Sequence, residues 1–273
     1  MMSFAVRLAV LLFASTSFAA PETARIEPPA GTADMAVSWM QVRVPDLGVL
    51  VLAIARPSGE GPFPTVIILH GTHGFAREYV QLARALAEQG VLGVAACWFS
   101  GGRGAGLRFV TPVHCSEAPA ISLAASPTAQ KTVSALVAAV RSLPDVERNS
   151  LALFGHSVGG GTVLNYALDT GGIRAAVIES AGYTDEQVAR IARLKVPLLI
   201  LHGAGDTSAD GGSPFQTPQK ARSFEAALRA ASKPVEAVYY DNAGHNTIFT
   251  EPKQFDDAVR RIVSFIAQPP ETR

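Results

Sequence analysis

The stretch Leu151-Ala-Leu-Phe-Gly-His-Ser-Val-Gly-Gly-Gly161 decides the fold predicted for this chain. Its apolar start, Leu151 to Phe154, is typical of a strand buried on both faces of a parallel sheet. Gly155-His156-Ser157-Val158-Gly159 matches G-x-S-x-G and is followed by a helical pattern over 158–168. A strand, this motif and a helix together predict a sharp turn that exposes the Ser157 hydroxyl, because flanking glycines let the helix pack closely. The alternative is an ordinary glycine-rich turn.

Apolar runs alternate with helical patterns on both sides of this turn. Strands are expected at 36–44, 49–55, 65–69, 91–96, 150–154, 174–179, 196–201 and 235–240. Helices are expected at 77–89, 128–142, 158–168, 185–194, 218–231 and 252–266. An initial hairpin followed by this alternation predicts an α/β fold with a mostly parallel central sheet and helices on both faces. Residues 180–195 leave room for one helix, so no cap domain is expected.

The first twenty residues have the layout of a secretory signal peptide. A short start with one positive charge precedes the apolar run Leu8 to Phe13, and Ser17-Phe18-Ala19 offers small residues for cleavage near Ala19 or Ala20. We therefore expect a signal peptide at 1–20, a linker at 21–35 and the folded domain at 36–268. An uncleaved membrane anchor is the alternative, although the run is short for a bilayer span. The mature protein is expected to be exported, without stable membrane association.

Composition limits the classes of partner. The 273 residues are 48% hydrophobic, which fits a large core. Lys plus Arg number 23 and Asp plus Glu number 23, so the formal net charge is zero. A neutral chain has no long-range field to hold nucleic acid or an anionic membrane, and we expect neither partner. Nothing in the sequence indicates the oligomeric state.

A serine hydroxyl at the predicted turn needs a base before it can act as a nucleophile at neutral pH. His245 follows the last expected strand, and Asp206 follows the one before it. The order Ser157, Asp206, His245 is the order found in the α/β-hydrolase fold. Asp210 lies four residues beyond Asp206 and is the competing carboxylate.

An oxyanion formed at Ser157 would need two backbone N–H donors. Val158, directly after the serine, is one candidate, and Thr72 in the loop after the strand at 65–69 is the other. His70, at the start of this loop, is expected to be structural. The possible pocket residues are His73, His156 and Trp98. An exposed loop position for His73 and a core position for Trp98 are equally compatible with the sequence.

The chain has two cysteines, Cys97 and Cys115. Neither lies in a CxxC or Cys/His cluster, so we expect no metal site. An even number in an exported protein suggests one disulfide, which would tether the long irregular segment 97–127. Two separate buried thiols are the alternative.

These motifs together resemble the α/β-hydrolase superfamily and, within it, the dienelactone hydrolase-like esterases. The resemblance covers roughly 36–268 and rests on His70-Gly71, the Ser157 turn, Leu201-His202-Gly203-x-x-Asp206 and Ala243-Gly244-His245. Dienelactone hydrolases carry Cys where this chain has Ser157. The run 155–161 also looks like the turn of secreted cutinase-like polyesterases.

The resemblance implies hydrolysis of a small-molecule ester through an acyl-enzyme, without a cofactor. Two alternatives remain. One is a prolyl-oligopeptidase-like peptidase or amidase, whose catalytic domains share these motifs. The other is a non-catalytic binding protein on the same scaffold.

Overall fold

Nine strands form one sheet in the part of the chain that the structure describes, residues 21–102, 110–120, 124–207 and 213–268 of a computed structural model. Their order is β1-β2-β3-β5-β4-β6-β7-β8-β9. The strands are β1 (Glu22–Ile26), β2 (Ser38–Val44), β3 (Gly48–Ala55), β4 (Phe63–Leu69), β5 (Leu92–Cys97), β6 (Val146–His156), β7 (Ala176–Glu179), β8 (Leu198–Gly203) and β9 (Val235–Tyr240). Pairing is antiparallel from β1 to β5 along this order and parallel between the remaining neighbours. The predicted fold class is confirmed.

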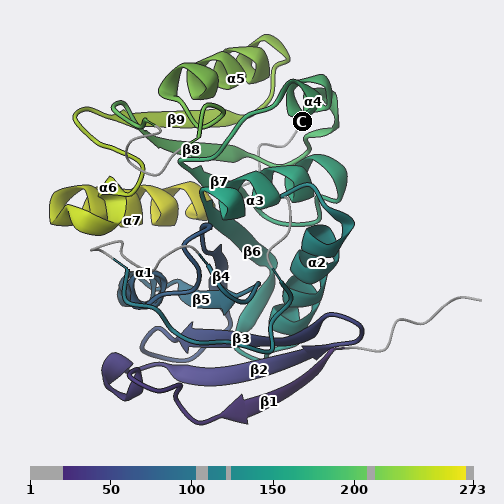
Figure 1. Ribbon diagram of the computed structural model, residues 1–273, viewed down its shortest axis with the longest axis vertical. Helices are drawn as coiled ribbons and strands as arrows, with labels where there is room; N and C mark the ends of the chain where they lie inside the picture. The colour runs from purple at the N-terminus through teal and green to yellow at the C-terminus, as the bar shows by residue number, and fades with distance from the viewer. Residues whose placement is uncertain (1–20, 103–109, 121–123, 208–212, 269–273) are drawn as a thin grey trace, which may run out of the picture.

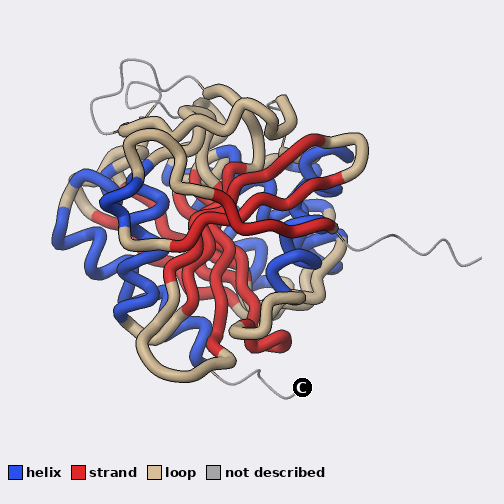
Figure 2. Tube along the Cα trace, turned by 90° about the horizontal axis from the view of Figure 1, so that it is seen from below, coloured by secondary structure: helices blue, strands red, loops and turns tan. Residues whose placement is uncertain are grey.

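Helices cover both faces of the sheet. They are α1 (Arg77–Glu88), α2 (Pro127–Arg141), α3 (Val158–Asp169), α4 (Asp185–Ala189), α5 (Pro218–Ala230), α6 (Thr247–Thr250) and α7 (Pro252–Ala267). Helices α1 and α7 lie together on one face, and α2 and α3 lie on the other (Figure 1). Figure 2 shows the strands fanning out between these layers, as the right-handed twist of strands requires.

Several helices begin where the sequence supplies a cap. The Ser126 side chain accepts a hydrogen bond from the Ala129 N–H at 3.1 Å, and the Thr217 side chain accepts one from the Lys220 N–H at 3.3 Å. In both helices a proline occupies the first helical turn, where its missing N–H costs nothing. These caps fix where α2 and α5 start.

The expected linker at 21–35 is the main correction to the predicted organisation. Glu22–Ile26 forms β1 and pairs antiparallel with β2, and a short 3-10 helix follows at Ala33–Met35. The folded domain therefore begins before residue 36. This strand lies at the edge of the sheet and most of its residues are exposed, so it lacks the apolar pattern by which the other strands were predicted.

The segment between β7 and β8 is as small as predicted. Residues 180–195 contain only α4 and a 3-10 helix at Ile191–Arg193, and they form no cap domain. The long segment after β5 is hydrogen-bonded to the rest of the domain. Its described part returns to the loop after β4, where the Val113 N–H donates to the Phe75 carbonyl and the Arg77 N–H donates to the Thr111 carbonyl.

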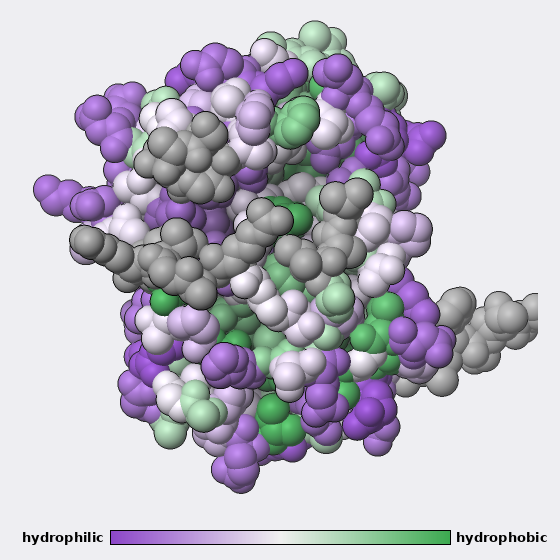
Figure 3. Space-filling model, viewed as in Figure 1, coloured by the Kyte–Doolittle hydropathy of each residue, from purple (hydrophilic) through white to green (hydrophobic). Residues whose placement is uncertain are grey.

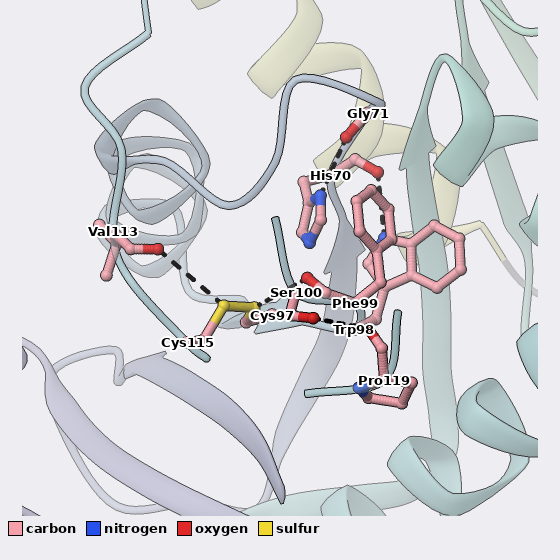
Figure 4. The surroundings of a disulfide bond; sticks show 9 residues. All are labelled: His70, Gly71, Cys97, Trp98, Phe99, Ser100, Val113, Cys115 and Pro119. Atoms are coloured by element: carbon pink, nitrogen blue, oxygen red, sulfur yellow. Dashed lines mark hydrogen bonds between the residues drawn. A yellow bond between two sulfur atoms is a disulfide. The ribbon is translucent and has the colours of Figure 1, made fainter. Parts of the chain in front are cut away.

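A disulfide joins Cys97 at the end of β5 to Cys115, with a Cα–Cα distance of 6.5 Å, as predicted. Beyond Cys97, the rings of Trp98 and Phe99 lie beside the His70 imidazole (Figure 4), with centroids 5.8 and 4.3 Å from it. The disulfide is consistent with an exported protein. It also anchors the segment that supports the loop after β4.

In the view of Figure 3, hydrophilic side chains lie mainly around the rim, and apolar side chains show nearer the centre. Among the described residues, Val188 and Phe215 are the large hydrophobic side chains that are exposed. No described helix is long and apolar enough to cross a membrane. The expected signal peptide, residues 1–20, lies outside the described residues.

Candidate active site

The turn at Ser157 connects β6 directly to α3 and has a backbone conformation that few residues adopt. Ser157 has φ 56° and ψ −117°, a strained conformation that costs about 1–3 kcal/mol in most proteins. A Cβ on Gly155 would come within 2.3 Å of the Gly159 carbonyl oxygen, and one on Gly159 within 2.5 Å of the Leu69 carbonyl oxygen. Both positions therefore require glycine. The close packing holds the serine at the carboxyl end of β6.

The three residues predicted as nucleophile, base and acid lie in contact. The Ser157 Oγ is 3.0 Å from His245 Nε2, and the His245 Nδ1 is 2.9 Å from Asp206 Oδ2. All three are nearly buried, with exposed fractions of 4%, 3% and 2%. Because β8 and β9 end at the same edge as β6, residues far apart in sequence meet there. Asp210, the competing carboxylate, lies outside the described residues.

Asp206 keeps its negative charge despite its burial. Burial alone would raise its pKa, but hydrogen bonds from His202 and His245 outweigh it and lower the pKa. The His202 Nε2 is 3.3 Å from Asp206 Oδ2 and 3.2 Å from the Gln216 carbonyl oxygen. Both oxygens are acceptors, so this nitrogen carries a hydrogen. The result is a carboxylate that can orient His245 over the whole neutral range.

The loop after β4 lies against the serine. A Cβ on Gly71 would come within 3.1 Å of the Ser157 Cβ. The Gly71 N–H donates to the Tyr79 hydroxyl at 2.9 Å, so this N–H is not available to an oxyanion at Ser157. Among the described residues, neither the Thr72 N–H nor the Val158 N–H has a hydrogen-bond partner. These two donors, proposed from sequence for the oxyanion, are therefore available.

The Tyr79 hydroxyl is the centre of a buried network behind this loop. It lies 2.6 Å from His73 Nε2 and 2.7 Å from His156 Nδ1, in addition to accepting from Gly71. One hydroxyl proton can go to only one of the two imidazoles, so the other imidazole must donate. Burial lowers the pKa of His73 to about 4, with a smaller contribution from the charge of His245. Both imidazoles are therefore neutral at physiological pH, since burial also lowers the pKa of His156.

The other side of the His156 ring faces a buried carboxyl group. Its Nε2 is 3.3 Å from Glu179 Oε2 and 3.3 Å from the His245 carbonyl oxygen. Burial raises the pKa of Glu179 well above its usual range, and the Ser180 hydroxyl, donating at 2.8 Å, only partly opposes this. His156 thus connects the loop after β4 to the backbone of His245.

The predicted pocket residues lie in the interior. His156 is 0% exposed and Trp98 is 1% exposed, so neither lines an open pocket. The Trp98 Nε1–H donates to the His70 carbonyl at 3.0 Å, which places the indole under the loop after β4. His73 is also buried and stacks on Tyr79, with ring centroids 5.5 Å apart. Burial lowers the pKa of His70 to about 3, so its imidazole is neutral at physiological pH.

Gln216 is a contact of the serine that sequence reasoning missed. Its Nε2 donates to Ser157 Oγ at 2.9 Å and to the Ser180 carbonyl at 3.3 Å. It lies in the loop between Asp206 and α5, directly before the helix cap Thr217, and belongs to no motif. Its neighbour Phe215 is 59% exposed. Only the proximity of this loop to the acid residue could have suggested a role.

The fold and the arrangement of serine, histidine and aspartate define an α/β-hydrolase. The sequence matches the dienelactone hydrolase family over residues 51–265. The protein belongs to this family and is accordingly a hydrolase.

Individual relatives agree with this assignment. A Methylorubrum extorquens protein named "Putative carboxymethylenebutenolidase" is 26% identical over 214 residues, covering 75% of this chain and 70% of the relative. The crystal structure of a Klebsiella pneumoniae protein named "Putative Dienelactone Hydrolase" matches 86% of this chain and 100% of its own, with TM-score 0.66 and 22% identity. An esterase from Pyrococcus furiosus matches 91% of this chain and 98% of its own, with TM-score 0.65 and 16% identity. Both structures share the fold.

Proposed function

We propose that the protein is a secreted serine hydrolase that cleaves small carboxylic esters through an acyl-enzyme on Ser157. The observation that carries this proposal is the continuous contact from Ser157 Oγ through His245 to the ionised Asp206. A hydroxyl, an imidazole and a carboxylate in this order form the arrangement that activates a serine nucleophile.

In the first half of the reaction, Ser157 Oγ attacks the ester carbonyl carbon while its proton passes to His245 Nε2. The negative charge that develops on the carbonyl oxygen is stabilised by the N–H groups of Thr72 and Val158. Asp206 holds the imidazole in the required tautomer and stabilises its charged form. The bond to the alcohol oxygen then breaks, and His245 returns the proton to the departing alcohol.

In the second half, water replaces the alcohol. His245 takes a proton from the water as it attacks the acyl carbon, and the bond to Ser157 Oγ breaks as that oxygen regains a proton. The free acid leaves, and the serine is restored. These steps need no cofactor, because every proton moves between the substrate, water and the two side chains.

Secretion and the open site are part of the proposal. The disulfide between Cys97 and Cys115 and the sequence pattern of residues 1–20 support export. Residues 180–195 form no cap over Ser157. We therefore expect water-soluble esters to turn over without activation at a lipid interface. A sharp rise in rate above the critical micelle concentration would contradict an open site.

The experiment combines a mechanism-based probe with a substrate screen. Purified protein should be labelled by a fluorophosphonate at Ser157 and should hydrolyse p-nitrophenyl esters, with the preferred acyl length read from a series of increasing chain length. Amino-acyl p-nitroanilides in the same assay test the peptidase alternative. Faster turnover of the anilides would replace ester hydrolysis by amide hydrolysis. Absence of both labelling and turnover would favour a binding protein.

A further inference from the structure

The side-chain amide of Gln216 has a fixed orientation at the nucleophile. The atom that lies 3.3 Å from the Ser180 carbonyl oxygen must be the nitrogen, because a carbonyl oxygen only accepts hydrogen bonds. The same nitrogen lies 2.9 Å from Ser157 Oγ. Its second hydrogen therefore points at the serine oxygen. Ser157 Oγ accepts this bond, and its own proton is left for His245 Nε2.

The backbone of Gln216 is also fixed by hydrogen bonds. The Gln216 N–H donates to the Ser213 carbonyl at 2.9 Å, and the Gln216 carbonyl accepts from His202 Nε2 at 3.2 Å. The same imidazole nitrogen of His202 contacts Asp206. The position of Gln216 is thus coupled to that of the acid. The Gln216 side chain also packs against Gly182, where a Cβ would come within 3.4 Å of the Gln216 Cγ.

Gln216 approaches Ser157 from the side opposite the loop that carries Thr72, one of the two expected oxyanion donors. Gly71 and Thr72 follow β4, which is the neighbour of β6 on one side. Gln216 is bonded to Ser180, which follows β7, the neighbour of β6 on the other side. The amide is therefore placed to contact the serine oxygen itself and not the carbonyl oxygen of a bound ester.

We propose that Gln216 is a further catalytic residue, which donates a hydrogen bond to Ser157 Oγ and favours its expulsion from the acyl-enzyme. The inference rests on the proposed function, because it concerns the same acyl-serine. In the acyl-enzyme Oγ is an ester oxygen and a weak acceptor. When the acyl carbon–Oγ bond breaks, the electron pair goes to Oγ, which is protonated by His245 and is then a strong acceptor. An interaction that strengthens in this step lowers its barrier.

The same argument predicts a smaller effect on acylation. Before attack, Oγ is a hydroxyl oxygen that already accepts the Gln216 hydrogen bond, so the interaction gains less in that transition state. Removing the donor should therefore slow deacylation by about 10- to 100-fold and acylation by less. The acyl-enzyme should accumulate.

The test compares wild type with Gln216→Leu, which keeps the size without a donor, and Gln216→Glu, which replaces the N–H by an acceptor. Gln219→Leu, on the exposed side of α5, is the matched control. Stopped-flow measurement with p-nitrophenyl acetate gives the burst rate for acylation and the steady rate for deacylation. Mass spectrometry of the quenched enzyme measures the acylated fraction, and melting temperatures report folding.

The expected result is a larger acylated fraction and a slow steady phase in both Gln216 variants, with Gln219→Leu unchanged. Fluorophosphonate labelling separates the two proposals. If wild type is labelled and the Gln216 variants deacylate at the wild-type rate, only the role of Gln216 is overturned. Equal slowing of both phases, or a higher KM with unchanged phases, would mean that Gln216 has a structural role. If wild type is neither labelled nor active, the proposed function fails and this inference with it.

Discussion

Two groups of a hydroxyl, an imidazole and a carboxyl lie side by side at the carboxyl ends of the parallel strands. The serine series consists of Ser157, His245 and Asp206, and the tyrosine series consists of Tyr79, His156 and Glu179. The two imidazole centroids are only 5.1 Å apart. The same functional groups therefore occur twice within one small region, and the difference between them lies in their surroundings.

The carboxyl groups show this difference. Two imidazoles lower the pKa of Asp206 in spite of its burial, whereas burial raises the pKa of Glu179, which has one hydroxyl donor. The hydroxyls differ as well. Ser157 stands on a strained turn beside the Thr72 and Val158 N–H groups, which have no partner in the described part of the chain, while three partners surround the Tyr79 oxygen. The comparison suggests that the serine series reacts and the tyrosine series holds its neighbours in place.

The largest expected effect is that of Ser157→Ala. We expect ester hydrolysis to fall by about a thousandfold or more, because the nucleophile is lost, while the fold remains. Initial rates with p-nitrophenyl acetate and a circular dichroism spectrum measure both quantities. Turnover close to that of wild type would show that Ser157 is not the nucleophile, and the serine series would then no longer differ from the tyrosine series in reactivity.

The acid of the serine series should come next. Asp206→Asn leaves His245 without the carboxylate that fixes its tautomer, so kcat should fall by about 10²- to 10⁴-fold. Asp210→Asn is the matched control and should have little effect on kcat. If Asp210→Asn is the damaging change, the acid has been assigned to the wrong residue.

Tyr79→Phe removes the hydroxyl of the tyrosine series and with it the hydrogen bonds that this oxygen makes with Gly71, His73 and His156. The free energy of unfolding should fall by about 1–3 kcal/mol. The kcat should fall only by about tenfold, because the Gly71 loop loses an anchor but no reacting group is removed. Urea unfolding and steady-state kinetics test this. Tyr239→Phe, whose hydroxyl bonds Glu225 in a half-buried position, provides a comparison. A kcat loss as large as that of Ser157→Ala would make Tyr79 part of the chemistry.

The last expected effect is a change in how the stability of the protein depends on pH. Because the folded-state pKa of Glu179 is raised, the folded protein binds a proton that the unfolded chain releases above pH about 4.3. Stability of the wild type should therefore fall as pH rises, by at most about 1.4 kcal/mol per pH unit until the folded-state pKa is passed. Glu179→Gln lacks this penalty and should become relatively more stable between pH 5 and 8.

Urea unfolding of wild type and Glu179→Gln at several pH values measures this difference. Glu88→Gln, at an exposed position of α1, controls for the loss of a negative charge. A stability difference that stays constant with pH would show that Glu179 is ionised in the folded protein.

The serine series could be predicted from sequence and the tyrosine series could not. Ser157, Asp206 and His245 each follow an apolar strand, and their order along the chain is characteristic of the fold. Tyr79 lies within a helix, 77 positions from His156 in sequence. Gln216 lies 59 positions from Ser157 and in no motif. Such contacts depend on how segments distant in sequence pack together, so a local sequence pattern cannot predict them.

The fold shows the same limit. Strands buried on both faces, such as β4 and β8, are continuous apolar runs and were placed within a few residues. The exposed edge strand β1 was missed because most of its side chains are exposed, and its backbone hydrogen bonds to β2 attach it to the sheet.

The position of the disulfide has a consequence for how the protein resists reductants. Cys97 is buried in the sheet, whereas Cys115 is only partly buried. A small thiol would therefore reach the Cys115 sulfur first and would have to displace Cys97 as a thiolate into an apolar interior. A thiolate released there is a poor leaving group, so exchange should be slow until the chain opens. Once formed, the bond should outlast brief exposure to a reducing medium, and its lifetime should follow the rate of unfolding.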